Sequence, residues 1–273
     1  MAYQNFQINS QPQLNIHHWP AKNSMHTILC VQGLGGHGGY YQWLADEMNK
    51  QNISVVAFDL RGHGYSQGTK GDIESFNEYA EDLLRAFNEI KTMFSEQKIH
   101  ILGESMGASI LTHAILNYSL KVSSILFVSP VLEPYMSFSI KEVFKFILWA
   151  PINRSKPVLN LRGNEEKGCR DKAFNDYLKA DKLFMEKASV RFMAKLSFFM
   201  NSALKNIQNL EYPIAVFQPQ NDKVTRYKTL KKTFEKLPQK KAWVLYPEAF
   251  HCLTHDPMTP QMYRDIEEWV KSF

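Results

Sequence analysis

The sequence predicts an α/β fold, in which a mostly parallel eight-stranded sheet is flanked by helices. Short apolar segments typical of strands alternate with amphipathic segments typical of helices, which is the pattern of a parallel sheet covered on both faces. With 273 residues, 44% of them hydrophobic and 22% charged, the chain can bury a large core. The alternation stops once, between residues 131 and 205. We therefore expect a core formed by residues 1–130 and 206–273, with residues 131–205 inserted as a helical cap.

The expected strands are eight short apolar runs. The first two are close in sequence and predict a leading antiparallel pair, whereas the later ones are separated by helical segments. They span residues 6–8, 14–19, 26–32, 53–60, 98–102, 123–129, 213–217 and 242–246.

The expected helices of the core are recognised by the spacing of their apolar residues and by the residues at their N-termini. The helix at residues 75–94 opens with the capping box Ser75-x-x-Glu78, and its apolar residues recur every three or four positions. Proline at position 260 suits the first turn of the C-terminal helix. The other core helices are expected near residues 40–49, after residue 105 and near residues 228–236.

The cap segment contains no clear strand pattern and at least two amphipathic helices, near residues 139–150 and 187–201. It carries 14 Lys/Arg against 8 Asp/Glu, so the net charge of +5 is concentrated there. No basic cluster is dense enough to predict nucleic-acid binding. A solvated helical surface is the favoured interpretation of the excess, and attraction to an anionic surface is the alternative.

The three cysteines, Cys30, Cys169 and Cys252, are odd in number and lack C-x-x-C spacing. This argues against a disulfide framework or a zinc site and favours a reducing compartment. No secretory leader or membrane-spanning run is recognisable, so we expect a cytoplasmic protein.

The run Gly103-Glu104-Ser105-Met106-Gly107 lies between an apolar strand pattern and a helix pattern. A G-x-S-x-G sequence in this context is typical of a nucleophile elbow, where a sharp turn exposes the serine hydroxyl. Glycine on both sides avoids steric clashes at such a turn. The Met106 N–H would lie at a helix start, where backbone donors favour negative charge. We therefore expect Ser105 to be a nucleophile.

A serine nucleophile needs a general base and an acid that orients the base. Asp222 follows the expected strand at 213–217, and His251 follows the one at 242–246, in the order that this fold requires. Asp181 and Asn221 are weaker candidates for the acid, and His255 competes with His251 as the base. A metal held by His251 and His255 is disfavoured, because no glutamate adjoins the first histidine and no third ligand is in reach.

These motifs resemble the monoglyceride lipase and lysophospholipase branch of the α/β-hydrolases. The resemblance rests on the elbow, on Asp222 and His251, and on the runs at residues 32–37 (QGLGGH) and 58–66 (FDLRGHGYS), and it covers about residues 25–270. It implies an oxyanion hole formed by the backbone N–H groups of Leu34 and Met106. This chain has Gln32 where the family usually has histidine, which leaves open how the loop carrying Leu34 is held.

The expected function is therefore hydrolysis of single-chain lipid esters, such as monoacylglycerols or lysophospholipids, through an acyl-enzyme on Ser105 and without a cofactor. The large apolar side chains of the cap, among them Phe144 and Trp149, predict an acyl channel or a transient contact with a membrane surface. The alternatives are a general carboxylesterase or thioesterase for small soluble esters, and a catalytically inactive binding module. Intact Ser105, Asp222 and His251 argue against the inactive module.

Overall fold

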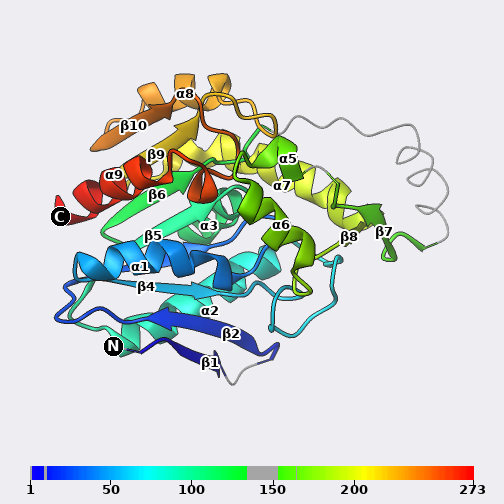
Figure 1. Ribbon diagram of the computed structural model, residues 1–273, viewed down its shortest axis with the longest axis horizontal. Coiled ribbons are helices and arrows are strands. Elements are labelled where there is room, and N and C mark those ends of the chain that lie inside the picture. Colours follow the sequence, from blue (N-terminus) through cyan, green and yellow to red (C-terminus); the bar gives the residue numbers. More distant parts are fainter. Residues whose placement is uncertain (1, 9–10, 134–152, 164) are drawn as a thin grey trace.

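The structure is a computed structural model that describes residues 2–8, 11–133, 153–163 and 165–273 (Figure 1). Its centre is an eight-stranded sheet with the strand order β1-β2-β4-β3-β5-β6-β9-β10. The leading strands β1 and β2 are antiparallel to each other, β2 is antiparallel to β4, and all other neighbours are parallel. The predicted mostly parallel sheet and its leading antiparallel pair are thus confirmed. The strands are β1 (Gln4–Ile8), β2 (Leu14–Trp19), β3 (His26–Val31), β4 (Ile53–Phe58), β5 (Lys98–Glu104), β6 (Ser124–Val128), β9 (Ile214–Pro219) and β10 (Lys241–Tyr246).

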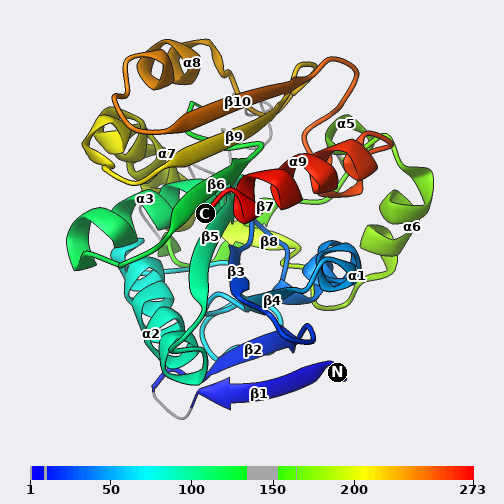
Figure 2. The same ribbon diagram turned by 90° about the vertical axis from the view of Figure 1, so that its left-hand side faces the viewer.

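Helices cover both faces of this sheet, as Figure 2 shows. Alternate residues of a strand enter different cores: Val31 packs into the core beneath α2, α3 and α8, whereas Cys30 packs into the core beneath α1 and α9. Burial on both faces explains why the central strands are continuous apolar runs. The core helices are α1 (Gln42–Lys50), α2 (Asn77–Met93), α3 (Met106–Tyr118), α8 (Lys228–Glu235) and α9 (Thr259–Lys271).

The start of α2 shows part of the predicted capping box. The Glu78 carboxylate accepts a hydrogen bond of 2.8 Å from the Ser75 N–H, and the Ser75 hydroxyl accepts one of 3.3 Å from the Asn77 N–H. These contacts satisfy backbone donors that the first helical turn leaves unpaired.

The segment between β6 and β9 contains a small second sheet, so the prediction of no strand between residues 131 and 205 is wrong. Two short antiparallel strands, β7 (Pro157–Asn160) and β8 (Lys187–Ser189), pair with each other. The helix expected at 187–201 accordingly begins later, as α7 (Val190–Asn206). Ser189 ends the strand and caps this helix, because its hydroxyl accepts a hydrogen bond of 2.9 Å from the Phe192 N–H. The same segment contains α5 (Glu165–Gly168) and α6 (Lys172–Ala180).

The predicted helix at residues 139–150, with Phe144 and Trp149, lies outside the described residues. We retain the name cap for residues 131–205, and its boundaries remain a prediction. No helix in the described ranges is long and apolar enough to cross a bilayer.

The described part of the cap is bound to the core by several polar contacts, two of which lie beside the loops that lead to the site. Asp181, which follows α6, accepts hydrogen bonds from the Tyr40 hydroxyl (2.5 Å) and from His37 (3.2 Å between Oδ2 and Nε2). At the start of α7, Arg191 forms an ion pair with Asp72. These contacts place the cap over the carboxyl edge of the sheet, where the loops after β3 and β10 also lie (Figure 1).

Candidate active site

Ser105 lies on a sharp turn between β5 and α3, as the G-x-S-x-G pattern predicts. Its φ of 54° lies in a region that residues other than glycine rarely adopt. A Cβ atom on Gly107 would come within 2.1 Å of the Val31 carbonyl oxygen, and one on Gly103 within 2.8 Å of the Ala108 backbone nitrogen. Both flanking positions therefore require glycine for the steric reason inferred from the sequence.

Ser105, His251 and Asp222 form one continuous hydrogen-bonded chain. His251 Nε2 lies 2.9 Å from Ser105 Oγ, and His251 Nδ1 lies 2.8 Å from Asp222 Oδ2. The three residues follow β5, β10 and β9, so the carboxyl ends of three parallel strands bring together side chains far apart in sequence. A serine, a histidine and an aspartate in this arrangement have the geometry that catalysis by a serine hydrolase requires.

Asp222 also organises its own loop. Its second carboxylate oxygen, Oδ1, accepts hydrogen bonds from the N–H groups of Val224 (2.7 Å) and Thr225 (3.1 Å). The weaker candidates for the acid have other partners: Asn221 donates to the Pro247 carbonyl, and Asp181 binds Tyr40 and His37. Only Asp222 among these three contacts His251.

The electrostatic environment of His251 favours its protonated form. Burial of the ring lowers its pKa, but the charge and hydrogen bond of Asp222, with a smaller contribution from Glu104, outweigh burial and raise the pKa above its usual value. A base that is stabilised as imidazolium can accept the serine proton readily.

His255, the competing candidate for the base, occupies a different environment. Its ring stacks on Phe174, with 3.6 Å between ring centroids and 8° between planes. Burial lowers its pKa to about 3. The ring is therefore neutral at pH 7 and forms part of an aromatic wall, while the contact with Ser105 belongs to His251.

The loop that follows β3 brings Leu34 into the cavity that Ser105 also lines. A Cβ atom on Gly33 would lie 3.0 Å from Ser105 Cβ, so the backbone of this loop passes directly beside the serine. Met106 begins α3, and the first N–H groups of a helix have no acceptor within the helix. The two N–H groups implied as an oxyanion hole thus belong to the loop after β3 and to the start of α3, and both segments adjoin Ser105.

Gln32 helps to hold this loop in place of the usual histidine. Its side-chain amide donates a hydrogen bond of 2.5 Å to the Gly36 carbonyl and so closes the loop on itself. The loop is also bound by the cap, because the Met185 N–H donates to the Gly35 carbonyl at 2.9 Å. The side-chain amide of Gln32 thus supplies a hydrogen-bond donor that holds the loop carrying Leu34.

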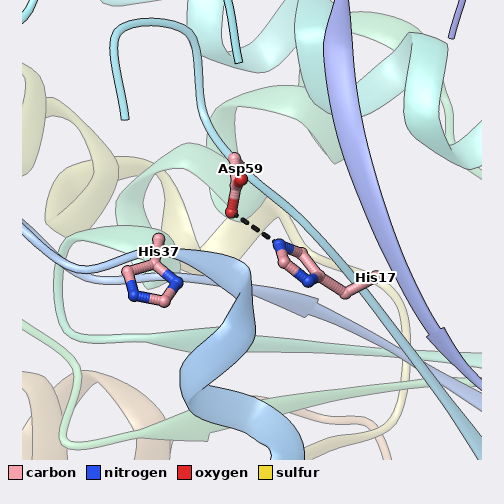
Figure 3. Close-up of side chains that lie close together, drawn as sticks. All are labelled: His17, His37 and Asp59. Atoms are coloured by element: carbon pink, nitrogen blue, oxygen red, sulfur yellow. Dashed lines mark hydrogen bonds and ion pairs between the residues drawn. The ribbon is translucent and has the colours of Figure 1, made fainter. Parts of the chain in front are cut away.

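Beneath the same loop lies a group of three side chains with the composition of a metal site: His17, His37 and Asp59 (Figure 3). Their polar atoms are already paired in the structure. His17 Nε2 lies 3.0 Å from Asp59 Oδ1, and His17 Nδ1 lies 2.8 Å from the Tyr3 hydroxyl. Both ring nitrogens of His37 also have partners: Nδ1 accepts from the Gly39 N–H at 3.1 Å, and Nε2 lies 3.2 Å from Asp181.

Asp59 is the acceptor at the centre of this network. The backbone N–H groups of Gly38 (2.7 Å) and Tyr65 (2.9 Å) donate to its two oxygens. Burial alone would raise its pKa, but the bond and charge of His17 and these backbone donors lower it below the usual value. We interpret the three side chains as a hydrogen-bonded group that holds residues 37–41 in place. Asp59 belongs to a run used for the family resemblance, but its partners could not be inferred from sequence spacing.

The cavity at Ser105 measures about 120 Å³. Its described walls are largely apolar and include Leu34, Phe174, Leu178, Phe184, Glu104 and His251. A second, larger cavity of about 550 Å³ lies between α1, α6 and α9 and shares Phe174, Thr254 and His255 with the first. Ser105 and His251 line the smaller cavity and not the larger one.

The fold, the elbow and the hydrogen-bonded serine, histidine and aspartate define an α/β-hydrolase. The family model described as serine aminopeptidase, S33 (Hydrolase_4), matches residues 22–258, and the chain belongs to this family.

Similar proteins agree with this membership. The chain is 25% identical to a monoglyceride lipase of Rattus norvegicus over 96% of its length and 88% of the relative's. It is 24% identical to a probable lysophospholipase L2 of Haemophilus influenzae over 80% of its length and 74% of the relative's. It also matches an uncharacterized abhydrolase domain-containing protein of Dictyostelium discoideum, of which it spans only 28%.

The fold is shared with a solved structure of a soluble variant of monoglyceride lipase from Saccharomyces cerevisiae. The TM-score is 0.82 at 18% identity, covering 99% of this chain and 94% of that one. The resemblance predicted from the motifs is therefore confirmed, and the chain is a serine ester hydrolase.

Proposed function

We propose that this protein hydrolyses esters of single-chain lipids, of the monoacylglycerol or lysophospholipid type, through an acyl-enzyme on Ser105. The observation that carries the proposal is the position of His251, which lies within hydrogen-bonding distance of both Ser105 Oγ and Asp222 Oδ2. A base in this position can activate the serine hydroxyl and remain oriented by the aspartate while it does so.

In the proposed reaction, His251 takes the proton of Ser105 while the oxygen attacks the ester carbonyl. The imidazolium then gives this proton to the departing alcohol, and a water molecule deprotonated by His251 releases the acyl group. The N–H groups of Leu34 and Met106 would stabilise the oxyanion in both steps. One such hydrogen bond typically contributes about 2.7–4 kcal/mol to transition-state stabilisation.

The choice of a lipid substrate is supported by two independent facts. The described cavity at Ser105 has mainly apolar walls and contains no lysine or arginine among its described lining residues. Relatives that align with most of the chain are named monoglyceride lipase and probable lysophospholipase L2. An uncharged head group suits the described walls better than an anionic one, because Glu104 is the only formally charged group among them.

The second candidate is hydrolysis of small soluble esters or thioesters. The specific observation in its favour is the cavity volume at Ser105, about 120 Å³, which accommodates a short acyl group without a channel. A catalytically inactive binding module is the least favoured alternative, because His251 contacts both the serine and the aspartate.

The cap is proposed to supply the acyl channel through Phe144 and Trp149, and to touch lipid surfaces transiently through its basic, apolar segment. We also propose a cytoplasmic location. The three cysteines are free thiols in the structure, which suits a reducing compartment.

The nucleophile is tested by Ser105→Ala together with a fluorophosphonate probe. We expect the wild type to be labelled at one serine, and the variant to lose both labelling and ester hydrolysis while its unfolding transition remains cooperative. Labelling that persists in the variant would show that another residue is the nucleophile.

The substrate class is tested with p-nitrophenyl esters of increasing chain length, beside monoacylglycerol and lysophosphatidylcholine. We expect kcat/KM to rise with chain length, because each buried methylene contributes roughly 0.8 kcal/mol. A preference for acetate or butyrate would favour the small-ester alternative.

The role of the cap is tested by Phe144→Ser and Trp149→Ser. Both should lower kcat/KM for long-chain esters and leave acetate esters nearly unaffected. Phe198→Ser is the matched control, because Phe198 is a cap aromatic that is 79% exposed. Equal losses for short and long esters would mean that Phe144 and Trp149 only hold the cap in place.

A further inference from the structure

The residue before the nucleophile, Glu104, is a half-buried carboxylic acid that lies among three loops of the site. It ends β5 and lines the Ser105 cavity. Its position in the elbow sequence gives no indication of a role, since that position of the G-x-S-x-G pattern is unrestricted.

We infer that Glu104 is a positioning residue for the proposed reaction, which joins the loops of the base and the oxyanion hole and stabilises the positive charge that His251 acquires. The inference rests on the proposed function for the reaction itself, and on the following contacts for the residue. It assigns Glu104 an electrostatic role with no proton transfer of its own.

The first contact is with the loop that carries the base. The Thr254 hydroxyl donates a hydrogen bond of 2.7 Å to Glu104 Oε1. Thr254 lies three residues after His251, and its backbone carbonyl accepts a further bond of 3.1 Å from the Tyr263 hydroxyl of α9. Glu104 therefore ties the short helix that follows His251 to the end of β5.

The second contact is with the loop after β3. The Tyr41 hydroxyl lies near Glu104 and affects its pKa, and it donates a hydrogen bond of 3.2 Å to the Val31 carbonyl oxygen at the end of β3. Tyr41 is buried and ends the short helix that closes the Leu34 loop. One carboxyl group thus connects the segments that carry Ser105, His251 and Leu34.

The charge of Glu104 has a limited set of partners in the described structure. Burial raises the pKa of Glu104 above its usual value, and the hydrogen bond from Thr254, the nearby Tyr41 hydroxyl and the proximity of His251 reduce that rise without cancelling it. The neighbouring titratable groups are the thiols of Cys30 and Cys252 and the phenols of Tyr41 and Tyr263, whose own pKa values are all raised. These neighbours are neutral at pH 7, so His251 is the one group near Glu104 that gains a positive charge during the reaction.

His251 in turn faces two carboxylates from different elements. Asp222 binds its Nδ1 from the loop after β9, and Glu104 acts from the end of β5 without a direct bond. When the proton of Ser105 moves to Nε2, both negative charges stabilise the imidazolium. Removing the Glu104 charge should therefore make His251 a weaker base and leave its hydrogen bonds intact.

The decisive variant is Glu104→Gln, which keeps the length of the side chain and an acceptor oxygen for Thr254. We expect the acidic limb of the kcat/KM profile to move to lower pH by about half to one unit. We also expect kcat on the plateau to fall by about tenfold, with KM little changed. Glu104→Ala removes the same charge and must move the limb in the same direction, even if glutamine is poorly accommodated.

Two controls separate charge from structure. Thr254→Val removes the hydrogen bond but keeps the carboxylate, so it should lower kcat while leaving the limb near its wild-type pH. Glu47→Gln removes a carboxylate from α1 that pairs with Lys50 at the surface, and it should change neither quantity.

The pKa of His251 can be measured without any enzymatic activity, so it tests this inference separately from the proposed function. The His251 imidazole is titrated by NMR in the Ser105→Ala protein, with and without Glu104→Gln. We expect a lower pKa for His251 in the double variant. An unchanged pKa in the folded double variant would overturn the inference, whatever substrate the enzyme proves to use.

Discussion

Two buried histidine–aspartate pairs lie at the same edge of the sheet and differ in what the second histidine nitrogen contacts. In one pair, His251 binds Asp222 at 2.8 Å and directs Nε2 toward Ser105 Oγ at 2.9 Å. In the other, His17 binds Asp59 at 3.0 Å and places Nδ1 against the Tyr3 hydroxyl at 2.8 Å (Figure 3).

The surroundings of the two aspartates also differ. Asp59 accepts bonds from two backbone N–H groups of separate loops, those of Gly38 and Tyr65, and so links β4 to the loop after β3. Asp222 accepts backbone bonds from Val224 and Thr225, which lie two and three residues further along its own loop. The same pair of side chains can thus orient a base or join two loops, and its partners decide which.

The largest difference between the pairs should appear on replacing each aspartate by asparagine. Asp222→Asn should lower kcat by about four orders of magnitude, because the amide favours the wrong tautomer of His251. Substrate affinity should change little. Steady-state kinetics on a p-nitrophenyl ester measures this loss, and near-normal turnover would mean that the acid lies elsewhere.

Asp59→Asn should act mainly on stability. Asparagine has one acceptor oxygen in place of two, so at least one buried N–H group loses a charged partner, at a cost of about 1.5–3 kcal/mol in the free energy of unfolding. Urea denaturation measures the change, and kcat should fall far less than in Asp222→Asn. A variant as stable as wild type but equally inactive would contradict the distinction between the two pairs.

The smallest expected difference between the two pairs concerns the pH at which kcat/KM reaches half of its plateau. Burial lowers the pKa of His251, but Asp222, with help from Glu104, raises it above the ordinary value near 6.5. The protonated ring cannot act as base, so kcat/KM should rise with pH through a midpoint above that value. In Asp59→Asn the midpoint should stay where it is, since Asp59 does not face His251. A midpoint well below 6.5 would show that burial dominates.

The core and the serine, histidine and aspartate could be predicted because their signals are local. Gly103 and Gly107 mark a turn that only glycine permits, and each of Asp222 and His251 follows an apolar strand by a few residues. A parallel sheet then brings its carboxyl ends together whatever the distance along the chain.

Other features depend on contacts that no local pattern records. The strands β7 and β8 have four and three residues, too few to show alternation, and they pair across the α5–α6 segment. Gln32 is explained by the Gly36 carbonyl only when the loop is folded. Glu104 acquires its partners from Tyr41 and Thr254, which are 63 residues before it and 150 residues after it.

The backbone of Ser105 has a consequence for how this protein can be engineered or can evolve. A non-glycine residue held at a φ of 54° costs about 1–3 kcal/mol, which is a sizeable fraction of the stability of a domain. Glycine at this position would relieve that cost and remove the hydroxyl in the same step. Selection for thermal stability alone would therefore favour loss of this serine. A search for more stable variants should screen each variant for ester hydrolysis as well as for heat resistance.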